Sequence, residues 1–490
     1  MNRRELLQTL GAAGAFAHLS RPRAAFAQPG TGVAPTRAAS SEDLQARLAD
    51  AIARHKVPGA SAAVFRDGQL TTAAAGVANL ASGVEMTPET IMHIGSITKV
   101  FNATLLLWLV DQGRIALDQP LTQYLPDFRV ADPAASEQIT VKMLMNHTSG
   151  IDGELTPEAG HDQERIADAI PRIAAMGQIH APGADLSYCN AAVVLAGYLA
   201  QHLTGKSWYD LIKERIFTPL EMRHAIVVPE DALLHRASVG HFLNPGEGRP
   251  VRTSFAFLPL SYAPAGATAM MSAADLVTFA RTHLSDGVAP NGQRLLSAAS
   301  ARLMRLKTAS YQGPSFGDLG LGWILLENGV VTHTGGGPGI VSALYAHPAS
   351  QTAVAVLTNA AHGTPVINEI VSPILEAVAR VKPLGSATAE LVKQATDAPV
   401  DPGPYVGQYE SIATVTRVIA QGNGIAFTSR SKFKFYDTTS LTEGPPLQLR
   451  PIRGGQFAAG TASVVGFVNP DGSGRMGHLA TGGRLLKRVA

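Results

Sequence analysis

Residues 96–111 read SITKVFNATLLLWLVD. Apolar side chains recur on every helical face between Val100 and Val110, and Gly113 is a residue type that commonly follows the last turn of a helix. A helix that is apolar nearly all round is buried in the core of its domain. The stretch therefore predicts a buried helix from Ser96 to Asp111.

Ser96 and Lys99 are three positions apart at the start of this helix, so their side chains share one face and can touch. A serine hydroxyl is a poor nucleophile unless a base removes its proton. Lysine normally titrates near roughly 10.4, but desolvation or a neighbouring positive group lowers its pKa enough for it to accept a proton. Backbone N–H groups at the helix N-terminus also lie near Ser96, where an oxyanion would form.

The spacing Ser-x-x-Lys is not specific by itself. It recurs as Ser429/Lys432 and Ser431/Lys434, in a β-like stretch where a spacing of three places side chains on opposite faces. In isolation, the first pair would be read as a helix N-cap followed by a solvated lysine. A catalytic interpretation therefore depends on further polar groups.

Two further polar motifs follow in order. Tyr188-Cys189-Asn190 opens a predicted helix after a Pro-Gly pair, and Thr332-His333-Thr334-Gly335-Gly336 lies between two predicted strands. With these motifs the sequence resembles the serine β-lactamase and penicillin-binding-protein superfamily, specifically its class C-like branch of esterases, D-aminopeptidases and related peptidases. The resemblance covers residues 57–358 and includes MLMNHTSG at 143–150 and GLGW at 320–323.

The resemblance implies a role for each matching position. Ser96 would be the nucleophile, Lys99 its immediate proton partner, and Tyr188 a general base or acid that relays the proton to the leaving group. Which of Lys99 and Tyr188 is the base is a coupled problem that the sequence leaves open. The Asn190 amide would hydrogen-bond the substrate amide and Lys99. The backbone N–H groups of Ser96 and Gly336 would form the oxyanion hole. The substrate would lie along an edge strand that carries His333, Thr334 and Gly335.

Two positions depart from the pattern of this superfamily. His333 stands where β-lactamases usually carry lysine, which argues against a dedicated β-lactamase. A histidine titrating near roughly 6.5 would be a weak, pH-dependent anchor for a substrate carboxylate. Glu221 stands where relatives commonly have glycine, and we expect a structural reason for it.

The remaining pattern predicts an α/β (α+β) fold of the β-lactamase/DD-peptidase type: an antiparallel sheet built from both ends of the catalytic region, flanked by helices, with a mostly helical insertion and a small C-terminal β-domain. Helical spacing is expected at 42–55, 190–204, 209–216, 273–284 and 365–381, and strands at 59–65, 70–77, 341–347 and 353–358. A proline-rich stretch begins near Asp397. The expected domains are an export signal at 1–27, a serine hydrolase domain at 28–396 and a barrel-like domain at 397–490.

The composition excludes several classes of protein. Of 490 residues, 46% are hydrophobic and 16% charged, and the net charge of +2 comes without a dense Lys/Arg block, so we expect neither nucleic acid nor an anionic membrane surface as partner. Arg3-Arg4, a mild apolar stretch and Ala25-Phe26-Ala27 predict a twin-arginine export signal and a periplasmic or secreted protein; a disordered tail is the alternative. The apolar stretch is too short for a stable membrane span.

Cys189 is the only cysteine, so no internal disulfide can form. A buried spacer is a simpler interpretation of it than a nucleophile, because no cysteine-protease pattern surrounds it. No Gly-x-Ser-x-Gly, His-Glu-x-x-His or paired Cys/His cluster occurs, so we expect no α/β-hydrolase, no metal and no cofactor.

The sequence favours a peptidase for small or non-standard peptides, containing D-residues or linearised, that works through an acyl-enzyme on Ser96. A carboxylesterase of the same family is one alternative, and a penicillin-binding sensor that does not turn over is another. The substrate is expected to be a small molecule or a short peptide. The sequence does not determine the oligomeric state.

Overall fold

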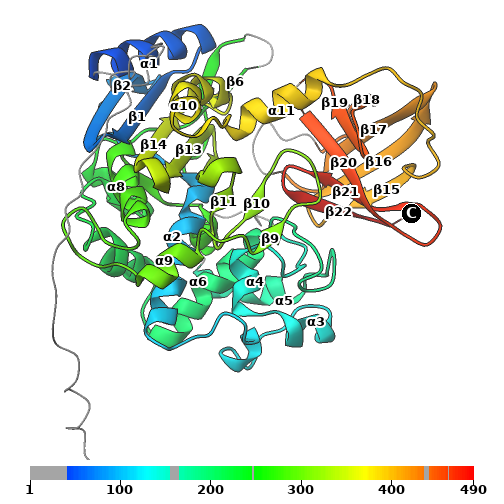
Figure 1. Ribbon diagram of the computed structural model, residues 1–490, viewed down its shortest axis with the longest axis horizontal. Coiled ribbons are helices and arrows are strands. Elements are labelled where there is room, and N and C mark those ends of the chain that lie inside the picture. The colour runs from blue at the N-terminus through cyan, green and yellow to red at the C-terminus, as the bar shows by residue number, and fades with distance from the viewer. Residues whose placement is uncertain (1–40, 155–164, 245–247, 435–440, 462, 490) are drawn as a thin grey trace, which may run out of the picture. The chain divides into compact units, whose positions relative to one another are not determined.

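The computed structural model describes residues 41–154, 165–244, 248–434, 441–461 and 463–489. The predicted export signal at 1–27 lies outside these residues. The catalytic region is built on a nine-stranded sheet in which every paired strand is antiparallel (Figure 1). Its strand order is β3 (Val84–Glu85), β2 (Gln69–Asn79), β1 (Gly59–Arg66), β14 (Thr352–Thr358), β13 (Ile340–His347), β12 (Val331–Gly337), β11 (Ile324–Leu325), β10 (Asp318–Leu319) and β9 (Ala309–Ser310).

The two ends of the catalytic region meet in the middle of this sheet. Strand β1 pairs with β14 from Ala60–Thr358 to Phe65–Ala353, so segments almost 300 residues apart are neighbours. This confirms the predicted antiparallel sheet made from both chain ends.

Each face of the sheet packs against helices, because side chains alternate along the strands. Ala343 and Tyr345 of β13 join the core beneath α1 (Ser41–His55) and α10 (Thr364–Ala379). Leu344 and Ala346 point to the other face, into the larger core shared with α8 (Ala273–Leu284). The helices predicted at 42–55, 273–284 and 365–381 are therefore present within two residues of their predicted ends.

The predicted helix at 96–111 is a single turn followed by a longer helix. The 3₁₀ turn η1 (Gly95–Ile97) leads into α2 (Thr98–Asp111). Leu105 and Leu106 of α2 are no more than 1% exposed. Truncating either to alanine would cost about 2 to 5 kcal/mol, the range for well-packed core leucines.

Further short helices and strands complete the catalytic region. The helices are α3 (Pro133–Gln138), α4 (Val141–Met145), α5 (Ile170–Ala174), α6 (Asn190–Thr204), α7 (Trp208–Ile212), which continues as a π-helical turn over Lys213–Phe217, and α9 (Ala298–Leu303). The small strands are β4 (Met92–His93), β5 (Ala225–Ile226), β6 (His241–Leu243), β7 (Pro250–Arg252) and β8 (Met270–Met271).

The C-terminal strands close into a barrel, as the β-like pattern predicts. They are β15 (Gly407–Glu410), β16 (Thr414–Gln421), β17 (Gly424–Ser431), β18 (Leu447–Pro451), β19 (Gln456–Ala459), β20 (Ser463–Pro470), β21 (Met476–Thr481) and β22 (Arg484–Arg488). Helix α11 (Leu384–Lys393) packs on the barrel through Val392, which contacts Ala458 and Val464. The boundary at residue 396 stays a prediction.

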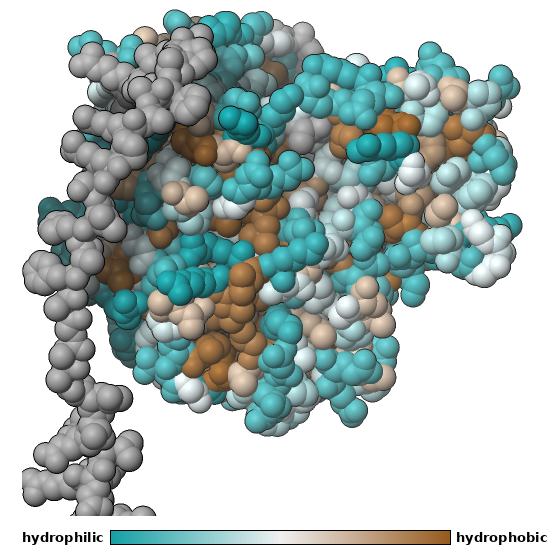
Figure 2. All heavy atoms as spheres, in the orientation of Figure 1, coloured by the Kyte–Doolittle hydropathy of each residue, from teal (hydrophilic) through white to brown (hydrophobic). Residues whose placement is uncertain are grey.

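The face of the molecule seen in Figure 2 is largely polar. Figure 2 shows hydrophilic residues over much of one face, interrupted by smaller hydrophobic patches. Within the described ranges, no helix is long and apolar enough to cross a membrane.

Candidate active site

Ser96 and Lys99 lie in contact at the junction of η1 and α2. The Nζ atom of Lys99 is 2.9 Å from Oγ of Ser96 and donates a second hydrogen bond of 2.6 Å to the carbonyl oxygen of Ala265. The Lys99 side chain is almost completely buried, at 2% exposure. The arrangement keeps the amine pointed at the serine hydroxyl.

Burial gives Lys99 the protonation behaviour of a base. Desolvation, assisted by the positive charge of Arg484 and opposed by the negative charge of Glu154, lowers the pKa of Lys99 to about 7. A neutral amine is therefore well populated near pH 7, although an unperturbed lysine would be almost fully protonated. In that form Lys99 can accept the proton of Ser96.

Glycines allow the substrate-lining strand β12 to approach Ser96 closely. Gly95 has φ +51°, and a Cβ atom there would lie 2.6 Å from the carbonyl oxygen and 2.8 Å from the nitrogen of Gly336. A Cβ atom on Gly335 would lie 1.9 Å from the carbonyl oxygen of Ile94. Only glycine fits these contacts, which bring the backbone of Gly336 beside the turn that carries Ser96.

Tyr188 completes the group of reactive side chains. Its ring centroid lies 4.9 Å from Nζ of Lys99. Burial raises the pKa of the Tyr188 phenol well above its usual value, an effect only partly offset by a hydrogen bond with Ser96. The phenol is therefore protonated near neutral pH, which suits a proton donor better than a base.

The segment Ser187–Cys189 is held on one side by the turn at His147. The backbone N–H of Ser187 donates to the carbonyl oxygen of His147, at 3.0 Å. The N–H of Cys189 donates to Nδ1 of His147, at 3.1 Å. The imidazole and Tyr188 rings pack with centroids 4.3 Å apart. Because Nδ1 accepts a hydrogen bond, His147 is neutral, and burial lowers its pKa well below the usual value.

The same segment is held on its other side by the β21–β22 hairpin of the barrel. The N–H of Tyr188 donates to the carbonyl oxygen of Gly483 at 2.8 Å, and Nη1 of Arg484 donates to the carbonyl oxygen of Tyr188 at 3.0 Å. The N–H of Leu485 donates to Oγ of Ser187 at 3.1 Å. The barrel therefore contributes directly to the position of Tyr188.

Two charged residues of the site were missed by the sequence reasoning. Nη2 of Arg484 is 2.5 Å from Oε2 of Glu154, and Oε1 of Glu154 accepts a 2.6 Å hydrogen bond from Nδ2 of Asn190. Asn190 thus binds Glu154 where a bond to Lys99 was expected, and its Oδ1 atom is buried with no partner in the described part of the chain. No local motif marks Arg484, because the structure brings it to Tyr188 across 296 residues.

The substrate-lining strand has one open edge. Residues 331–337 of β12 pair with β13, whereas β11 pairs only with Val331 and Thr332. Among the described strands, the edge along Thr334, Gly335 and Gly336 is therefore unpaired on one side. An extended substrate can add to such an edge by backbone hydrogen bonds.

His333 does not titrate as the sequence suggested. It is 3% exposed, and its Nδ1 atom lies 2.7 Å from the carbonyl oxygen of Thr334. Burial, together with the charge of Lys99, lowers the pKa of His333 to about 3. The expectation of a titration near 6.5 is wrong, because desolvation disfavours the charged ring, and His333 is neutral across the physiological range.

Two other residues singled out in the sequence have structural explanations. Cys189 is fully buried, burial raises the pKa of its thiol to about 11, and its Sγ atom accepts a hydrogen bond from the N–H of Ala192 at the start of α6. This fits a spacer and helix cap. Glu221 has φ +54°, a backbone conformation that explains why glycine would suit the position.

Comparisons with known proteins identify the family of this chain. The protein-family model named Beta-lactamase matches residues 44–376. Penicillin-binding protein 4 of Amycolatopsis lactamdurans is 37% identical over 365 residues, which cover 73% of this chain and 94% of that protein. The chain belongs to the β-lactamase family and is a hydrolase of that serine-hydrolase family.

Solved structures show the same relationship. The crystal structure of SurE superposes with a TM-score of 0.72 at 25% identity and covers 92% of this chain and 99% of that one. The D-amino acid amidase of Ochrobactrum anthropi SV3 has a TM-score of 0.58 at 27% identity and covers 68% of this chain and 97% of that one. The likeness to SurE thus extends beyond the residues that the family model matches.

Proposed function

We propose that this protein hydrolyses amide bonds in small peptides that contain D-residues, through an acyl-enzyme on Ser96. The observation that carries the proposal is the buried Lys99 amine, 2.9 Å from the Ser96 hydroxyl and with a pKa lowered to about 7. The related D-amino acid amidase supports an amide substrate with a D-residue.

In the proposed reaction, Lys99 accepts the hydroxyl proton while Ser96 Oγ bonds to the substrate carbonyl carbon. The negative charge that develops on the carbonyl oxygen is stabilised by the backbone N–H groups of Ser96 and Gly336. Tyr188 gives its proton to the leaving amine as the C–N bond breaks, and the proton held by Lys99 restores the phenol. Water then attacks the acyl carbon. Tyr188 and Lys99 transfer one proton from the water to Oγ of Ser96 as the acyl–oxygen bond breaks, which releases the acid and restores the free enzyme.

The neutral His333 and the strand edge at Thr334–Gly336 favour a substrate bound through its backbone. An ester would use the same groups, so an esterase is the alternative within this chemistry. A penicillin-binding sensor would form the acyl-enzyme and stop there. Multiple turnover separates both enzymes from the sensor.

The test combines covalent labelling with a substrate panel. A phosphonate probe should add one adduct to the intact protein, detected by mass spectrometry, and Ser96→Ala should abolish both labelling and turnover because the acyl bond has nowhere else to form. D-residue peptide amides, matched L-peptides, simple esters and a cephalosporin should then be assayed on one preparation. Labelling that survives in Ser96→Ala would contradict the assigned nucleophile, and an adduct without turnover would favour the sensor.

We also propose that the chain is exported and cleaved after Ala27, as the order of arginine pair, apolar stretch and Ala-Phe-Ala supports. Amino-terminal sequencing of the protein from the periplasm or medium tests this. Full-length protein that stays in the cytoplasm would contradict it.

A further inference from the structure

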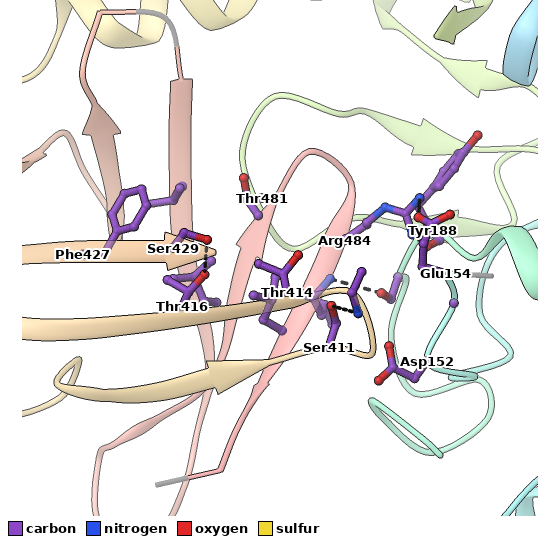
Figure 3. Close-up of a pocket in the computed structure, with 17 residues that line it drawn as sticks. Asp152, Glu154, Tyr188, Ser411, Thr414, Thr416, Phe427, Ser429, Thr481 and Arg484 are labelled. Carbon is purple, nitrogen blue, oxygen red and sulfur yellow. Dashed lines mark hydrogen bonds and ion pairs between the residues drawn. The ribbon is translucent and has the colours of Figure 1, made fainter. Parts of the chain in front are cut away.

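A chamber lies between the catalytic region and the open end of the barrel (Figure 3). It holds about 300 Å³ of space. Barrel hydroxyls line one side, including Thr414, Thr416 and Ser429, with apolar side chains such as Phe427 among them; Asp152 and Tyr188 line the opposite side. The walls therefore come from two parts of the chain, the catalytic region and the barrel.

The size and position of the chamber suit part of a substrate. Its volume lies at the lower end of the range for ligand pockets. Tyr188 both lines the chamber and hydrogen-bonds with Ser96, so the chamber and the nucleophile share a wall. Ser96, Lys99 and His333 are not among the residues that line the chamber, so Tyr188 is the link between a group bound there and the nucleophile.

Among the charged groups around the chamber, one carboxylate forms no direct ion pair. Arg484 is paired with Glu154 at 2.5 Å, and Lys432 is paired with Glu410 at 2.7 Å. Asp152 accepts a 2.6 Å hydrogen bond from the backbone N–H of Ile412 but has no ion pair among the described residues.

Burial of a carboxylate that is in no direct ion pair is costly. Desolvation raises the pKa of Asp152, although the hydrogen bond from Ile412 and the charges of Lys432 and Arg484 oppose this shift. A bound cation would remove much of that cost. The hydroxyls opposite can accept or donate hydrogen bonds to amide groups, and the apolar side chains between them can contact a hydrocarbon side chain.

We propose that this chamber is a substrate subsite that binds the ammonium-bearing end of a short peptide, with the ammonium group at Asp152 and the adjoining residue along the hydroxyls of β16 and β17. The proposal rests on the proposed function, because it assumes that the bound peptide is the substrate of Ser96. It adds a charge requirement that the catalytic groups themselves do not impose.

The first experiment measures binding in full-length protein carrying Ser96→Ala, so that no turnover occurs. The ligands are tri-D-leucine with a free amino terminus and its N-acetyl form, titrated by calorimetry. The free amine should bind about tenfold or more tightly than the acetylated peptide, the usual worth of a hydrogen bond to a charged group. Asp152→Asn keeps an acceptor for Ile412 and removes the charge, so the ratio should fall to near one.

An unchanged ratio in Asp152→Asn would overturn the proposal, as would no measurable binding of either peptide. Thermal unfolding of each variant establishes that it is folded. The two proposals can fail separately, because labelling of Ser96 by a small phosphonate does not need the chamber. Loss of that labelling in Asp152→Asn, measured with Ser96 intact, would overturn the assignment of Asp152 to the chamber and place it in the catalytic centre.

A second experiment fills the chamber. Ser429 faces inward and its Oγ atom is 3.0 Å from Oγ1 of Thr416, whereas its neighbour Thr428 points to the opposite face of β17 and its hydroxyl reaches Glu443. Ser429→Leu should weaken binding of both peptides about fivefold or more, as expected for lost space and hydrogen bonds. Thr428→Leu is the matched control and should change neither. Equal effects of the two variants would overturn the chamber as the binding site.

Discussion

Ser96 and Tyr188 are two members of the proposed catalytic group, yet the protein holds them in different ways. Ser96 and Lys99 are neighbours on one turn, and Nζ and Oγ meet at 2.9 Å through local helical geometry. Tyr188 lies in an extended segment that is hydrogen-bonded to the His147 turn on one side and to the Gly483–Leu485 hairpin on the other. The nucleophile pair is therefore a local structure, whereas the proton donor depends on contacts with remote parts of the chain.

Because of this difference, changes in the barrel should affect Tyr188 and the Ser96–Lys99 pair differently. Changes in the barrel should affect the steps that need Tyr188 and leave the approach of Lys99 to Ser96 mostly intact. They should also affect the pKa of Lys99, because Arg484 of the same hairpin lowers it. Four changes, from the largest expected effect to the smallest, test the comparison.

Tyr188→Phe keeps the ring in its place and removes the hydroxyl. Proton transfer to the leaving group should fail, with a loss of about 10² to 10⁴ in kcat, the usual worth of a general acid-base group. The melting temperature should stay close to that of the parent, since the ring still packs on His147. A near-normal rate on peptide substrates would move the whole proton-transfer role to Lys99.

Removing the chain after Thr396 takes away every barrel contact to Ser187–Cys189. The nine-stranded sheet ends at Thr358, so the truncated protein should fold and unfold cooperatively. Peptide turnover should fall by about 10², the lower end of the value of a general acid, while phosphonate labelling of Ser96 falls much less. The two rates are measured on one sample. An insoluble or unfolded product would show that the barrel is part of the core and that the boundary at 396 is wrong.

Arg484→Gln removes a positive charge and retains a donor for the carbonyl oxygen of Tyr188. In the proposed mechanism neutral Lys99 is the active form, so kcat/KM should rise as pH passes through the Lys99 pKa of about 7. Without Arg484, and with Glu154 left unpaired, that pKa is higher and the rise moves to higher pH. At pH values below the rise, each pH unit by which the profile shifts upward lowers kcat/KM about tenfold. The control Arg484→Lys keeps the charge; a pH profile that is unchanged in Arg484→Gln would exclude this coupling.

His147→Asn should have the smallest effect. Asparagine tolerates the positive φ of +60° at this position, so the turn should persist. The lost ring contact with Tyr188 is worth about 0.5 to 1.5 kcal/mol, which corresponds to roughly a threefold to tenfold fall in kcat with little change in KM. His202→Asn on the exposed side of α6 is the control. A change in KM with kcat constant would instead place His147 in substrate binding.

Much of the fold could be read from local patterns. The strand signals at 341–347 and 353–358 predict strands, and the apolar run at 96–111 predicts a buried helix. The structure contains both, with the helix beginning after a short turn at Gly95–Ile97. These features depend on the periodicity of side-chain types over a few residues, which can be read directly from the sequence.

The sequence by itself determined the α/β fold, the barrel at the C-terminal end, the family and the spacing that lets Lys99 touch Ser96. Only the tertiary structure decided the low pKa of Lys99, the neutral state of His333, the partner of Asn190 and the chamber at Asp152. The physical reason is that helical and strand spacing act between neighbours along the chain. Desolvation, charge pairing and enclosed volume depend on which distant segments meet, as Arg484 meets Tyr188 across 296 residues.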